Sequence, residues 1–101
     1  KAAEGNMVNG AKQGTWRIYD EANNLRIVSE YIDGQEHGAG YVYRENATTL
    51  SSTIHSHGVI QEMYLYNDAN EWDLRVIYKN GIAVQAYRKT NGKIEEVPVE
   101  E

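Results

Sequence analysis

The chain has no cysteine, no phenylalanine and a single proline among its 101 residues. Without cysteine it forms no disulfides, although this absence does not identify a redox compartment. No apolar run approaches the ~20 residues that cross a bilayer as a helix, so we expect no membrane insertion. The sequence shows no export signal but starts at Lys1 rather than Met, and a removed export signal is one explanation.

Positive charge is also scarce. Ten Lys and Arg are scattered among fifteen Asp and Glu, and the net charge is −5. Proteins that bind nucleic acid need a concentrated positive face. We therefore expect no nucleic-acid partner. The length predicts one domain over residues 1–101.

The chain does contain a repeating glycine pattern. Turn glycines recur at intervals of 24, 24 and 23 residues: Gly10, Gly34, Gly58 and Gly81. A second glycine follows four residues after each of the first two, at Gly14 and Gly38. A fixed period of this size indicates one supersecondary unit that is repeated and stacked.

The glycines belong to turn signals, with Asn-Gly and Asp-Gly as the strongest hairpin signals. Between the turns lie runs of about 7–10 residues rich in Val, Ile, Tyr, Thr and Trp, which is the composition of strands. Strands joined by short turns run antiparallel. The sequence thus predicts an all-β, single-domain antiparallel meander of about seven or eight strands. It would be built from ~24-residue hairpin repeats and twisted or partly rolled, because right-handed twist accumulates across a sheet.

The two ends of the chain differ from the repeats. Residues 1–8 have no clear period and are expected to be a lead-in, either frayed or a partial strand. Residues 98–101 form an acidic tail, in which Pro98 and the surrounding glutamates protect an edge strand against unwanted pairing.

Alternation along each strand assigns side chains to the two faces of the sheet. It predicts three groupings: Trp72 with Leu74 and Val76, Ile60 with Tyr64 and Tyr66, and Ile82 with Ala86. Several strands are partly apolar on both faces. This favours a sheet that curls on itself, with the packing of two copies as the alternative.

The frame Asn/Asp-Gly-x-x-x-Gly-x-(Trp/Tyr)-x-x-Tyr, which is clearest over residues 9–31 and 33–43, resembles the variant MORN repeat of bacterial proteins. The units from Gly58 and Gly81 lack the second glycine and have Glu62 and Gln85 in its place. The resemblance implies stacked hairpins and a role in protein or membrane association. A looser likeness to small exported Bacteroides-type proteins of unknown function implies a periplasmic or secreted location.

Two histidines are the candidate metal ligands. His55 and His57 would share a face if both lay in an extended strand. A stable zinc site needs three or four ligands, and His37 is the only other histidine in the chain. The favoured interpretation is a solvent-exposed pair, so we expect no metal and no cofactor.

Catalytic patterns are weak. The sequence has neither a Gly-x-Ser-x-Gly elbow nor a phosphate-binding loop. No pattern brings together two of the strand and turn carboxylates, which are Asp20, Glu21, Glu30, Glu62 and Asp73. The protein is therefore predicted to be non-enzymatic.

The aromatic residues are eight Tyr and two Trp. Cross-strand pairing explains most of them. The candidates for an exposed binding stripe are Tyr43, Tyr64, Tyr66 and Trp72. We predict a binding or scaffolding module for a protein partner, with ligand and oligomeric state left open. The alternative is a carbohydrate-binding or hydrolytic accessory domain, which would use exposed aromatics and two carboxylates in a cleft.

Overall fold

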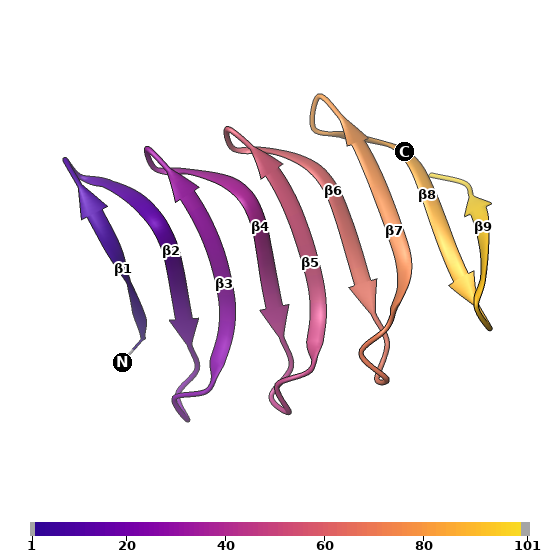
Figure 1. The fold of residues 1–101 in the computed structure, drawn as a ribbon, viewed down its shortest axis with the longest axis horizontal. Coiled ribbons are helices and arrows are strands. Elements are labelled where there is room, and N and C mark those ends of the chain that lie inside the picture. The colour runs from indigo at the N-terminus through magenta and orange to yellow at the C-terminus, as the bar shows by residue number, and fades with distance from the viewer. Residues whose placement is uncertain (1, 100–101) are drawn as a thin grey trace.

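The computed structural model describes residues 2–99 as one antiparallel sheet of nine strands in sequential order (Figure 1). The strands are β1 (Ala3–Val8), β2 (Ala11–Tyr19), β3 (Leu25–Ile32), β4 (Gln35–Tyr43), β5 (Thr49–Ser56), β6 (Val59–Tyr66), β7 (Trp72–Lys79), β8 (Ile82–Thr90) and β9 (Lys93–Val97). The predicted all-β meander is confirmed. The extra strand is β1, which occupies most of the expected lead-in. The sheet is open, with β1 and β9 at its edges. The described residues contain no helix that is long and apolar enough to cross a membrane.

Two-residue turns join β1 to β2, β3 to β4, β5 to β6, β7 to β8 and β8 to β9. Both residues of each turn have positive φ, as in Asp33 (50°) and Gly34 (84°). This is the type I′ geometry, whose twist matches that of the flanking strands. Successive turns are tied to the preceding unit in the same way: the amide of Gly34 donates to the carbonyl of Lys12 at 2.9 Å, and that of Gly58 to Glu36 at 2.8 Å.

Five-residue loops at the opposite end of the sheet cover residues 20–24, 44–48 and 67–71. Arg44 joins two of these loops. Its guanidinium donates hydrogen bonds to the carbonyl of Tyr66 at 2.6 Å and to that of Asn67, in the next loop, at 3.4 Å. The loops are therefore connected to one another and not only to their own strands.

Bulges account for the uneven repeat length. Near Gly14 and Gly38, the strands β2 and β4 each contain two more residues than the stretch of the preceding strand with which they pair. These glycines have φ values of 74° and 94°. At the corresponding place β6 contains only one residue more than the paired stretch of β5, and it has no glycine there. The unit between Gly58 and Gly81 is one residue shorter for this reason.

A second set of bulges lies near the start of β3, β5 and β7. In β7, Leu74 pairs with Leu65, whereas Trp72 pairs with Tyr66. The extra residue, Asp73, turns Trp72 onto the face of Tyr66. The predicted grouping of Trp72 with Leu74 is therefore wrong.

The other two groupings are wrong for the same reason. His55 pairs with Ile60, and Thr53 pairs with Met63, so Ile60 lies on the face of Met63 and not on that of Tyr64 and Tyr66. In β8 the register slips by one residue near its start.

After this slip Tyr78 pairs with Ala83, while Ile82 pairs with Lys79. Ala83 therefore shares a face with Ala86, and Ile82 does not. Strict alternation fails in each case because a bulge changes the face of every residue beyond it.

The corrected register defines two faces. The large side chains of the apolar face are those of Trp16, Ile18, Ile27, Tyr31, Val42, Ile60, Met63, Leu65, Leu74, Val76, Tyr78 and Val97. The tyrosine face holds Arg17, Tyr19, Leu25, Val28, Glu30, Tyr41, Tyr43, Ser52, Ile54, Glu62, Tyr64, Tyr66, Trp72, Arg75, Ile77, Ile82 and Tyr87.

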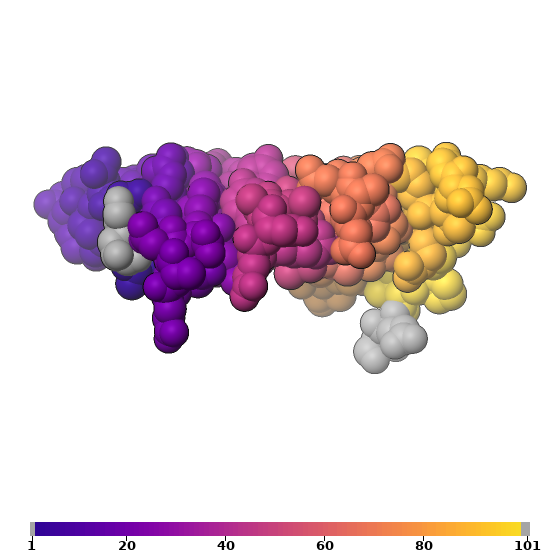
Figure 2. All heavy atoms as spheres, turned by 90° about the horizontal axis from the view of Figure 1, so that it is seen from below, coloured from indigo at the N-terminus to yellow at the C-terminus, as the bar shows by residue number. Residues whose placement is uncertain are grey.

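The sheet is a single layer, and Figure 2 shows it end-on as one band of atoms. No described side chain is fully buried, and the most buried apolar residues are Val76 (9% exposed) and Ala86 (6%). The accessible surface is 6792 Å², against about 5,800 Å² expected for a compact monomer of this mass. The radius of gyration is 15.2 Å, against ~13 Å for a compact chain of this length. Neither face is covered by a second layer formed by residues 2–99.

Candidate binding surfaces

Three of the four predicted aromatic residues lie together on the tyrosine face. Tyr64 and Tyr66 lie two residues apart on β6 and so share a face, and the bulge in β7 brings Trp72 beside them. The ring of Tyr64 meets that of Trp72 edge-on with centroids 5.7 Å apart, and the rings of Tyr64 and Tyr66 are 6.5 Å apart. Edge-on contact at this distance is a favourable aromatic geometry.

The fourth residue, Tyr43, belongs to a separate pair on β4. Its ring stacks on that of Tyr41 with centroids 6.3 Å apart. Strand β5 lies between the two clusters and contributes the small residue Ser52, which is 8% exposed. The hydroxyl groups of Ser52 and Tyr66 are 3.1 Å apart. The predicted stripe thus consists of two aromatic clusters, and Ser52 lies between them.

A charged network holds the larger cluster in place. The hydroxyl of Tyr64 donates to Oε1 of Glu62 at 2.5 Å, and Nε of Arg75 donates to the same oxygen at 2.6 Å. The guanidinium of Arg75 also lies 5.8 Å from the ring centroid of Tyr64 and 6.0 Å from that of Tyr87. These contacts restrict the rotamers of the side chains involved, which are Glu62, Tyr64, Arg75 and Tyr87.

The network shifts the ionisation of its members. The hydrogen bond from Tyr64 is the largest influence and lowers the pKa of Glu62. Burial opposes it, and the hydrogen bond and charge of Arg75 lower the pKa further. The same hydrogen bond to Glu62 raises the pKa of Tyr64. Glu62 therefore stays ionised and Tyr64 stays protonated near neutral pH, which keeps this hydrogen bond intact.

Sequence reasoning missed the polar partners of the cluster. Arg75 and Glu62 were not selected as binding residues, and neither was Lys89, whose ammonium lies 4.3 Å from the ring centroid of Trp72. Their contacts with the rings depend on the pairing of β7 with β6 and on the bulge in β7, which is defined only once these strands are paired.

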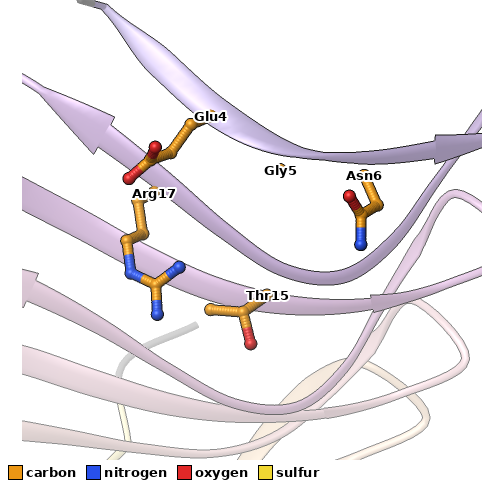
Figure 3. A pocket seen from close by; sticks show the side chains of 5 residues that line it. All are labelled: Glu4, Gly5, Asn6, Thr15 and Arg17. Atoms are coloured by element: carbon orange, nitrogen blue, oxygen red, sulfur yellow. The ribbon is translucent and has the colours of Figure 1, made fainter.

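A polar hollow of about 480 Å³ lies at the β1 end of the tyrosine face (Figure 3). It is lined by Glu4, Gly5, Asn6, Thr15 and Arg17, and Figure 3 shows Glu4 and Asn6 on either side of Gly5. The indole of Trp16 packs against Gly5, where a Cβ atom would overlap the ring. This hollow spans only two strands and lies away from the aromatic clusters.

The carboxylates of the central strands have separate partners. Glu30 accepts a hydrogen bond from Thr15 at 2.8 Å, and Glu62 belongs to the network with Tyr64. Glu30 lies on β3 and Glu62 on β6, so three strand spacings put them roughly 14 Å apart. Glycosidases hold their two carboxyl groups at about 5–9.5 Å. The spacing of this pair gives no support to the hydrolytic alternative.

The predicted histidine pair is divided by the turn. Strand β5 ends at Ser56, and His57 has a φ of 47° in the turn, so the assumption of one extended strand is wrong. Nε2 of His55 lies 3.0 Å from Oε2 of Glu36. His57 instead donates its backbone amide to Nδ1 of His37 at 3.0 Å. Residues 2–99 contain no group of three or more His, Cys, Asp or Glu that could hold a metal ion.

No protein-family model matches the chain, and no curated protein matches its sequence. Among solved structures, the fold is similar to part of a TarM mutant from S. aureus, crystallised in complex with fondaparinux, alpha-GlcNAc-glycerol and UDP. The TM-score is 0.62 at 13% sequence identity, and the match covers 80% of this chain and 17% of that chain. This similarity concerns the fold alone.

Proposed function

We propose that the chain is a non-enzymatic binding module that recognises a protein partner through its tyrosine face. The observation that carries the proposal is the packed cluster of Tyr64, Tyr66, Trp72 and Arg75, on a face that no other part of the described chain covers. Tyr, Trp and Arg are the residue types that dominate the energetics of protein interfaces. Because hydrogen bonds already fix the cluster, little side-chain entropy is lost when a partner binds.

The two tryptophans provide a matched test, since Trp72 lies on the tyrosine face and Trp16 on the apolar face. Proteins retained by the immobilised wild-type chain would be identified and purified, and their affinities measured by calorimetry. We expect Trp72→Ala to weaken binding by about 30-fold, as at a hot spot, and Trp16→Ala to have little effect. The proposal is wrong if Trp16→Ala abolishes binding while Trp72→Ala does not.

A carbohydrate ligand is the second candidate. The aromatic rings lie beside the charged groups of Glu62 and Arg75, an arrangement that suits a sugar ring with hydroxyl groups. The solved TarM structure, similar in fold over a small part of its length, was crystallised with sugar ligands. A glycan array probed with the wild type and with Trp72→Ala separates the two candidates. Glycan binding that depends on Trp72, without any protein partner, favours the carbohydrate.

A further inference from the structure

The apolar face, like the tyrosine face, is not covered by a second layer of residues 2–99, but it differs in chemistry. Its two central rows run across the whole sheet, and neither carries a charge between β2 and β7. The charged residues of this face lie on the outer strands or next to the turns: Lys12, Glu36, Arg88, Lys93 and Glu95. An uncharged centre with a charged rim is the composition of a protein–protein interface.

The amount of exposed surface agrees with one missing partner. The chain exposes about 1,000 Å² more than a compact monomer of its mass. A standard interface buries about 800 Å² on each partner. The sheet measures 44 by 33 Å in its two long dimensions, so part of one face is large enough for such an interface.

The relief of the apolar face suits a second copy of itself. Small residues on β3, β4 and β5 leave a hollow of about 310 Å³, lined among others by Ser29, Gly40, Ser51 and Thr53. Larger side chains, those of Met63, Leu65 and Leu74, stand on the adjacent strands β6 and β7. A twofold axis parallel to the strands, between β5 and β6, would place these larger side chains over the hollow of the other copy.

The same axis matches the outer strands. It sets β8 and β9 opposite β3 and β2 of the other copy. Here the apolar face has a second hollow of about 370 Å³, which includes the small residues Ala83 and Ala86. The large side chains of Trp16 and Ile27 come from the opposing strands. Large residues therefore meet small ones at both ends of the interface, which is what close packing requires.

We propose that two copies of this chain pack through their apolar faces into a symmetric dimer. The two sheets would be aligned as in a β-sandwich, roughly 10 Å apart. Both tyrosine faces would then point outward and remain accessible. The dimer stands independently of the function proposed for the tyrosine face.

Sedimentation equilibrium of the full chain tests the proposal. We expect the wild type to have twice the monomer mass of 11.5 kDa at about 50 µM. Leu65→Glu should raise the dimer dissociation constant by at least about 100-fold, because it places a charge at the centre of the interface. The matched control is Ile54→Glu, on the neighbouring strand but on the tyrosine face, which should remain dimeric.

Circular dichroism would show whether each variant is folded, and Ser51→Glu, in the hollow, replaces Leu65→Glu if that variant unfolds. Two results would overturn the proposal. One is a wild type that stays monomeric up to about 200 µM, well above the dissociation constants of typical stable dimers. The other is a dimer that Ile54→Glu disrupts and the apolar-face variants do not.

Discussion

The two faces of this sheet are built from alternate residues of the same strands, yet different interactions hold their side chains. On the apolar face the side chains pack by contact, and the most buried residue pair is Val76 beside Ala86. On the tyrosine face hydroxyl groups are paired, as in Tyr19 with Glu4 and Tyr64 with Glu62. Tyrosine has a polar end, so it tolerates water where leucine does not. The comparison explains how the tyrosine face can remain uncovered, while the proposed dimer would cover the apolar face.

The largest expected effect comes from neighbouring residues of β7 that point to opposite faces. Val76→Asp should destabilise the protein by at least ~3 kcal/mol or prevent folding, because it buries an unpaired charge. Arg75→Ala should cost only about 1 kcal/mol, because it removes a part-exposed ion pair. Urea unfolding at one fixed protein concentration measures both. Equal decreases in the free energy of unfolding would show that the two faces do not differ in how much they contribute to stability.

The turns belong to neither face, and a substitution there should have an effect on stability between those expected for the two faces. Gly34 has a φ of 84°, and a side chain added there has room beside Ala11. Gly34→Val should therefore destabilise by about 1–2 kcal/mol through backbone strain rather than steric overlap. The melting temperature should fall while the dimer mass stays unchanged. An unaltered melting temperature would contradict the turn assignment.

The smallest expected effect concerns ionisation on the tyrosine face. The pKa of Glu62 is lowered in the folded state by Tyr64 and Arg75, so protonation favours unfolding. Its contribution is present above the ordinary pKa of about 4.3 and is lost as the pH falls through the lower, folded value. Glu62→Gln should remove roughly 1 kcal/mol at pH 7 and flatten the acid side of the stability curve.

The matched control for that variant is Glu45→Gln, which alters an exposed carboxyl group in the loop between β4 and β5. It should leave the acid side unchanged. A Glu62→Gln curve that runs parallel to the wild type below pH 4 would show that the network on the tyrosine face contributes nothing to acid stability.

The candidate site was only partly predictable. Tyr64 and Tyr66 were chosen correctly as neighbours because they alternate along one strand without an intervening bulge. Trp72 was chosen for the stripe, but alternation assigned it to the opposite face. Arg75 was missed because an isolated arginine in a strand carries no signal until its cross-strand neighbours are known. The strand β1 was only one of two options for residues 1–8, because these residues do not alternate.

The sequence by itself determined where the chain reverses direction and that the strands run antiparallel. These are local properties: Asn-Gly and Asp-Gly favour positive φ wherever they occur, and short turns leave no other direction for the next strand. Only the tertiary structure decided which face each aromatic residue occupies and that no second layer of residues 2–99 covers either face. A bulge is a difference in residue count between two paired strands, so it exists only after pairing, and exposure depends on every strand at once.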